Sequence, residues 1–144
     1  MPIPNQKDIL SKLVSSLKNQ LSKTFQDFDV SFAYLSGSWV KGQQSSLSDI
    51  DIFVSYPQCN QTNPEDFLHW LTDINRISSE LMKSDILEIS VLERTPLHVQ
   101  FQAISEGILI FEQTKKIRIN YVENLLKLYY DHRIWYQKYL QQAV

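Results

Sequence analysis

The sequence contains little of what a disulfide-rich or linker-rich protein needs. Its one cysteine, Cys59, cannot form an intramolecular disulfide, and a cysteine cluster for a metal is excluded for the same reason. Three glycines and five prolines argue against long flexible linkers. The chain must therefore rely on a packed apolar core, for which 144 residues are sufficient.

Long apolar runs are also missing from the sequence. No stretch approaches the ~20 apolar residues that a membrane-spanning helix needs, and the first residues, MPIPNQKDILSK, lack the apolar segment of a signal peptide. Together with the single cysteine, these features predict a soluble protein of the reducing cytoplasm with no membrane partner.

The charges are unevenly distributed along the chain. Residues 49–113 hold eleven acids against three bases, whereas residues 114–144 hold six bases against two acids. A broad polynucleotide groove needs a basic stripe, so the acidic middle argues against direct nucleic-acid binding. The basic end fits a solvated helix face, with an acidic protein surface or an RNA as alternative partners.

The spacing of apolar residues predicts a mixed set of helices and strands. Asn63 and Pro64 predict a helix start, and Gly107 predicts a helix end. Strands are expected at 30–36, 49–55, 86–92 and 108–111. Helices are expected at 5–24, 64–82, 97–105 and 115–142.

This order predicts a mixed α/β fold, in which a small mixed sheet is flanked by helices and followed by a long C-terminal helix. We expect a single domain over residues 1–144. Its N-terminal helix lies within 1–26, the sheet and its helices within 30–112, and the C-terminal helix within 114–144.

Two aspartates on one strand are the first candidate site. On a strand, residues two apart point the same way, so Asp49 and Asp51 share a face while Ile50 and Ile52 turn to the core. Two carboxylates this close repel each other, so one must take up a proton or a cation must neutralise both. Mg²⁺ is the natural cation, because it binds carboxylates together with substrate phosphates.

A third acid is predicted to join them. In the strand at 86–92, Glu88 lies on the face opposite Leu87 and Ile89, whereas Asp85 has the wrong parity. If the two strands are neighbours, three acids converge on one sheet face, which suits two-metal phosphoryl chemistry.

The loop between the first two strands is predicted to hold phosphate. Gly37 and Ser38 follow a strand, and backbone N–H groups at such a turn bind anions. Gly37 would let the backbone approach a ligand closely. Lys41 could contact phosphate, but a solvent-facing lysine is an equal alternative.

These residues resemble a known family. Gly37-Ser38, ten intervening residues and Asp49-Ile50-Asp51 resemble the G-S-x10-D-x-D signature of the polymerase-β-like nucleotidyltransferases, and Lys41 and Ser48 also lie at positions typical of minimal members. Residues 87–112 resemble the second half of minimal nucleotidyltransferase (MNT) antitoxins, which are encoded beside HEPN-domain ribonuclease toxins.

The resemblance implies that the chain neutralises a HEPN toxin by transferring AMP from ATP to one of its tyrosine hydroxyls. Asp49 and Asp51 would hold two Mg²⁺ ions, and Glu88 would complete the shell of one ion and help to remove the hydroxyl proton. The family usually has aspartate at this third position, and glutamate is one methylene longer. The nucleotide would be bound by Gly37, Ser38, Lys41 and Ser48.

Two alternatives to this function stay open. The chain could be an antitoxin that acts by direct binding without catalysis. It could also be a nucleotidyltransferase for a small molecule or an RNA end, although no second domain is available to hold such a substrate and the middle of the chain is acidic.

The last helix has apolar and aromatic residues on more than one face. Such a stripe is most often part of a core, but aromatic residues beside Arg133 and Lys138 are also typical of interface anchors. Both interpretations remain open for Tyr121, Leu125, Leu128, Tyr129, His132, Trp135, Tyr136 and Tyr139.

Overall fold

The computed structural model of the chain describes residues 6–37, 40 and 49–142. The predicted order of helices and strands is confirmed, with two short 3-10 helices in addition. The helices are α1 (Gln6–Asp27), α2 (Pro64–Met82), α3 (Leu97–Glu106) and α4 (Lys115–Gln142). The strands are β1 (Phe32–Ser36), β2 (Ile50–Ser55), β3 (Leu87–Val91) and β4 (Ile108–Glu112), and the 3-10 helices are η1 (Pro57–Asn60) and η2 (Leu92–Arg94).

The sheet is small and mixed, as the sequence predicts. Its four strands lie in the order β3-β2-β1-β4. β1 is antiparallel to both β2 and β4, whereas β2 and β3 are parallel. A parallel pair needs a crossover, and α2 provides it between β2 and β3.

The start of α2 shows why this crossover helix forms where it does. The Asn63 side chain accepts a hydrogen bond of 2.8 Å from the backbone N–H of Asp66. Pro64 occupies the first turn, and Glu65 and Asp66 place negative charge near the positive end of the helix dipole. The predicted helix start is therefore confirmed.

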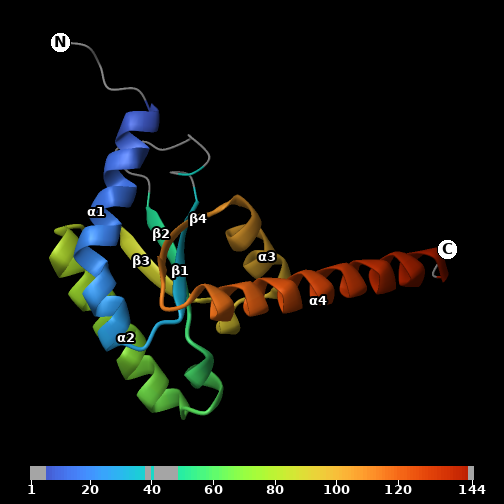
Figure 1. The fold of residues 1–144 in the computed structure, drawn as a ribbon. Helices are drawn as coiled ribbons and strands as arrows, with labels where there is room; N and C mark the ends of the chain where they lie inside the picture. Colours follow the sequence, from blue (N-terminus) through green and yellow to red (C-terminus); the bar gives the residue numbers. More distant parts are fainter. Residues whose placement is uncertain (1–5, 38–39, 41–48, 143–144) are drawn as a thin grey trace.

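Helices cover the two faces of the sheet unequally (Figure 1). α1 and α2 lie on one face, where Leu17, Leu21 and Phe25 of α1 form the main core with Ile52 and Val54 of β2. The other face is named the α3 face here. It carries a smaller cluster that includes Phe32, Tyr34, Leu92 and Ala103.

Only the beginning of α4 belongs to the α3 face. The Tyr121 ring packs edge-on against Phe32 with the ring centroids 5.1 Å apart, and its hydroxyl donates a hydrogen bond to Gln100 of α3. Leu125 is also buried. Beyond it, the helix projects away from the sheet (Figure 1). Among the described residues, no helix is both long enough and apolar enough to cross a membrane.

Gly107 ends α3 as predicted, but for a different physical reason. Its backbone N–H donates a hydrogen bond of 2.9 Å to the carbonyl oxygen of Ala103. Its φ of −79° is open to any residue, so no left-handed conformation requires glycine there. Close approach does, because a Cβ would lie 2.2 Å from the Ala103 oxygen and 2.9 Å from the Leu35 oxygen.

We therefore expect Gly107→Ala to lower the free energy of unfolding by about 1–3 kcal/mol, because both crowding atoms belong to the backbone and cannot rotate away. Urea unfolding followed by circular dichroism measures the change. Ser105→Ala, at an exposed position of the same helix, is the control and should leave the midpoint unchanged. A wild-type midpoint for Gly107→Ala would contradict the steric argument.

Candidate active site

The two aspartates lie where β2 begins. Asp49 directly precedes the strand and is exposed, and Asp51 is its second residue and is half-buried. Ile50 and Ile52 are buried on the core side, as the alternation of the sequence predicts. Asp51 therefore points to the α3 face.

Strand pairing brings Glu88 next to Asp51. β3 runs parallel to β2, and Glu88 lies directly opposite Asp51 in the register. On the other side of β2, Ser36 of β1 lies opposite Asp51. Neighbouring strands are about 4.8 Å apart, so these three residues form one polar row across the sheet. The prediction that the two acidic strands are neighbours is confirmed.

The electrostatics of this row centre on Asp51. Partial burial raises the pKa of the Asp51 carboxyl above its ordinary value, and the negative charges of Glu88 and Asp49 raise it further. A bound cation would stabilise the ionised Asp51 carboxylate and so lower this pKa.

The Gly37 backbone lies against the Asp51 side chain. Gly37 follows β1 with φ = +85°, a left-handed conformation that favours glycine. A Cβ there would lie 2.7 Å from Asp51 Oδ2, so a larger residue would have to push this carboxylate aside. The Gly37 carbonyl oxygen accepts a hydrogen bond of 3.2 Å from the N–H of Val40, which closes a tight turn. Ser38, Lys41 and Ser48 lie outside the described residues, and their roles stay predictions.

A cavity of about 150 Å³ opens beside Asp51 between the sheet and α3. Gly37, Ser36 and Phe53 line it from the sheet. Its other wall comes from α3, whose contribution the sequence analysis missed. The sequence places the α3 residues that line the cavity on one helical face, but their spacing does not reveal what that face covers. These residues are Val99, Gln102 and Ala103.

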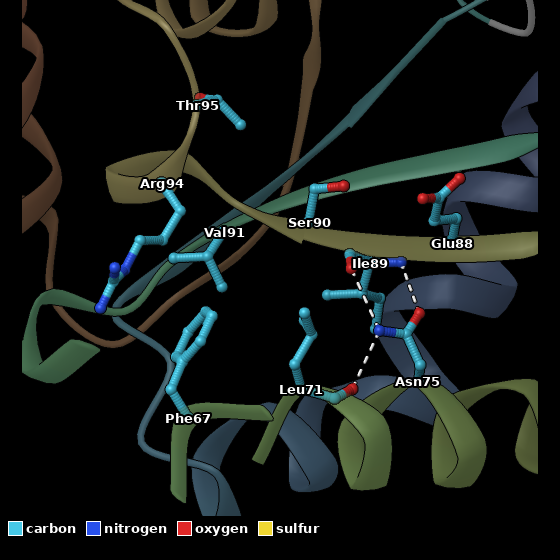
Figure 2. A pocket seen from close by; sticks show the side chains of 9 residues that line it. All are labelled: Phe67, Leu71, Asn75, Glu88, Ile89, Ser90, Val91, Arg94 and Thr95. Carbon is cyan, nitrogen blue, oxygen red and sulfur yellow. Dashed lines mark hydrogen bonds between the residues drawn. The ribbon is translucent and has the colours of Figure 1, made fainter. Parts of the chain in front are cut away.

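A second cavity of about 370 Å³ lies at the outer edge of β3 (Figure 2). Glu88 and Ser90 line it from the strand, and Phe67 and Leu71 line it from α2. The Arg94 guanidinium lies over the Phe67 ring, 4.8 Å from its centroid. Glu88 therefore lies between this cavity and Asp51, which lines the smaller one.

The edge of β3 is held by a side chain of α2, another feature that sequence analysis missed. The Asn75 amide accepts a hydrogen bond of 2.7 Å from Ile89 N–H and donates one of 3.1 Å to the Ile89 carbonyl oxygen (Figure 2). These bonds replace those that a further strand would make. Asn75 thus fixes the backbone next to Glu88.

Comparison with known proteins identifies this arrangement. The family described as "Polymerase beta, Nucleotidyltransferase" matches residues 19–116. The chain belongs to this nucleotidyltransferase family. The family and the fold class predicted from the sequence are both confirmed. No curated protein sequence matches the chain significantly.

Solved structures share the fold of this nucleotidyltransferase. A toxin–antitoxin crystal structure with AMP-PNP aligns over 88% of this chain and 97% of that chain, with a TM-score of 0.66 and 18% identity. A chain from the structure of a tri-AMPylated Shewanella oneidensis HEPN toxin in complex with MNT antitoxin aligns over 96% of this chain and 98% of its own length, with a TM-score of 0.55 and 14% identity. A putative nucleotidyltransferase from Sulfolobus solfataricus aligns over 80% and 95%, with a TM-score of 0.51 and 16% identity. At such identities the likeness is one of fold.

The donor set of the nucleotidyltransferase site suits a hard divalent cation. Asp49, Asp51 and Glu88 offer only oxygen ligands, which Mg²⁺ prefers over the nitrogen and sulfur ligands typical of zinc. Within residues 6–37, 40 and 49–142, no three acidic, histidine or cysteine side chains gather tightly enough to form a ready-made metal site.

We expect Asp51→Asn to raise the free energy of unfolding at pH 7 when no divalent metal or nucleotide is present. A raised pKa in the folded state means that the charged carboxylate opposes folding. Its penalty is absent below the ordinary pKa of 3.8 and develops as the pH rises through the folded-state value. The gain from Asp51→Asn should therefore shrink as the pH falls from 7 towards 4.

Urea unfolding at several pH values measures this gain. Asp85→Asn, which removes an exposed carboxylate just ahead of β3, is the matched control and should give a smaller change. Equal stability of Asp51→Asn and wild type at pH 7 would show that the row of acids is not under electrostatic strain.

Proposed function

We propose that this nucleotidyltransferase is an antitoxin that transfers AMP from ATP to a tyrosine hydroxyl of a cognate HEPN ribonuclease toxin and thereby neutralises it. The pairing of Asp51 with Glu88, next to the Gly37 turn, carries the proposal. The similar fold of an MNT antitoxin in complex with a tri-AMPylated HEPN toxin supports the nature of the partner, and the similar structure with AMP-PNP supports ATP as the donor.

Three acids would hold the metal. Asp49 and Asp51 would bind two Mg²⁺ ions, and Glu88 would complete the coordination of one of them. Bound in this position, the ions would neutralise the triphosphate and favour the ionised acceptor hydroxyl. The catalytic and metal-binding residues of the proposal are thus Asp49, Asp51 and Glu88.

The protein itself would bind and orient the nucleotide and accept the proton. The Gly37 turn, with Ser38, Lys41 and Ser48, would bind the triphosphate and orient the α-phosphorus towards the acceptor. The tyrosine oxygen would form a bond to the α-phosphorus. The bond between this phosphorus and the oxygen that links it to the β-phosphorus would break, so that pyrophosphate leaves. Glu88 receives the hydroxyl proton. Positioning would supply much of the rate acceleration.

Residues 1–144 would form one domain that acts on a protein acceptor. A partner protein brings its own scaffold, so no further substrate-binding domain is required. The single cysteine supports a reducing compartment, and we place the reaction in the cytoplasm.

A second candidate function is neutralisation by direct binding. The exposed apolar side chains of α4 favour it, because they provide a contact surface that does not depend on catalysis. Glutamate at position 88, where the family usually has aspartate, favours it as well.

The double change Asp49→Asn with Asp51→Asn separates the two functions. We expect it to abolish AMP transfer, because it removes the carboxylates while preserving side-chain volume. The intact mass of the toxin after incubation with the protein, ATP and Mg²⁺ should rise in steps of one AMP with the wild type and stay constant with the variant. If the variant still neutralises the toxin without adding AMP, direct binding is the function.

Glu88 offers a graded test of the same site. Glu88→Gln should lower the rate of AMP transfer by about 10²–10³-fold, because it removes both a proton acceptor and a metal ligand. Glu88→Asp retains the carboxylate and should keep more activity than Glu88→Gln. The measurement is the initial rate of AMP incorporation at saturating ATP. Equal rates for wild type and Glu88→Gln would exclude Glu88 from the reaction.

A further inference from the structure

We infer that the second half of α4, from Leu128 to Leu140, is the docking element for the protein acceptor and inserts into a groove of that partner. The inference rests on the proposed function for the identity of the partner, and its test below separates the two. This segment of α4 is called the docking segment here and is about 18 Å long at the usual helical rise.

The docking segment exposes more apolar surface than a solvated helix normally does. Six large apolar or aromatic side chains within thirteen residues are roughly half exposed or more, and such a concentration marks an interaction site. They are Leu128 (59%), Tyr130 (50%), Ile134 (52%), Trp135 (61%), Tyr136 (51%) and Leu140 (46%).

These side chains surround the helix. At about 100° per residue, Leu128 and Trp135 lie within about 20° of each other. Tyr130 and Ile134 form a second pair and Tyr136 and Leu140 a third, and the three pairs are separated by about 120°. Apolar side chains therefore lie on three sides of the helix, between charged and polar ones, whereas a solvated helix normally confines them to one face. A flat surface would cover one pair, so the geometry requires a groove that contacts the helix on several sides.

Among the described residues, α3 contacts only the start of this segment, where Phe101 also meets the Tyr130 ring edge-on. The contacts of α4 with α3 end near the stack of Phe101 on Tyr129, whose ring centroids are 3.8 Å apart. Beyond that stack the helix continues past α3 (Figure 1). Residues 131–138 are all exposed.

The docking segment and the acids lie on the same side of the sheet. Tyr121 anchors α4 to Phe32 on the α3 face, and Asp51 points to that face too. α3 stands between them, with Gln102 lining the cavity beside Asp51 and Phe101 against Tyr129. A protein that grips the docking segment would therefore lie beside α3, on the side from which an acceptor hydroxyl reaches Glu88.

The charge of α4 indicates the chemistry of the partner groove. Residues 115–142 carry six bases and two acids, and the docking segment itself contains Arg133 and Lys138 against one acid, Asp131. The complementary surface is an apolar groove with an acidic rim, because the rim charges steer association and the apolar centre supplies most of the affinity.

The test compares two exposed positions of the docking segment with an exposed leucine elsewhere. Leu128→Glu with Ile134→Glu adds charge to two faces of the docking segment, whereas Leu68→Glu changes an equally exposed leucine (61%) on α2. We expect the double variant to bind purified toxin roughly 100-fold more weakly by calorimetry, since anchor residues contribute one to two orders of magnitude each. Leu68→Glu should bind normally.

Kinetic measurements distinguish docking from chemistry. The double variant should show a raised KM for the toxin, with kcat and ATP binding unchanged. Circular dichroism checks the fold, and Leu128→Gln with Ile134→Gln replaces the double variant if the added charges unfold α4. If wild-type protein adds no AMP but binds toxin through these residues, the proposed catalysis fails and the docking inference stands.

Two results would overturn the inference. One is toxin binding by the double variant that equals that of the wild type. The other is a homodimer of the chain alone that these changes convert to a monomer without affecting toxin binding, as measured by light scattering. In that case a second copy of the chain occupies the docking segment.

Discussion

The parallel pairing of β2 with β3 is the constraint on which the site depends. It places Asp51 opposite Glu88 and turns both side chains to the α3 face, where partial burial and then the charge of Glu88 raise the pKa of the Asp51 carboxyl. A sheet that served only as a scaffold would not keep acids in register across neighbouring strands, because the repulsion opposes folding. The structure sustains it through the buried residues on the opposite side of the same strands and through Asn75, which holds the free edge of β3. The repulsion opposes folding at the place where a bound cation would relieve it.

Local sequence patterns predicted the elements of this site because the relevant rules are local. Alternation fixed the parity of Asp51 and Glu88, and Asn63 with Pro64 fixed the start of the helix that connects their strands. Residues that approach from distant segments left no such pattern. Gln102 and Val99 line the cavity because α3 packs on the sheet, and Asn75 reaches Ile89 because α2 lies along the strand edge. These contacts follow from tertiary packing, which residue spacing along the chain does not encode.

The two described glycines show how differently one residue type can be used. Gly37 is favoured by its left-handed backbone and lies against the Asp51 carboxylate, so it serves the site. Gly107 has an ordinary backbone conformation and is required because two carbonyl oxygens occupy the space that a Cβ would need, so it serves the packing of α3 on β1. The sequence predicts special backbone positions at both glycines, but only neighbouring atoms reveal which physical requirement applies.

The two halves of the long C-terminal helix differ in what stabilises them and in what they expose. Its first half is stabilised by burial of Leu125 and partial burial of Tyr121, whereas its second half keeps large apolar side chains in water. Helical order in that second half is therefore supported mainly by continuity with the anchored first half, since exposed helices gain little stability on their own. This arrangement suits association, because the segment is already ordered before binding and its apolar surface still has burial to gain. A partner that buries it would be positioned and stabilised by the same contact, on the side of the sheet where the acids lie.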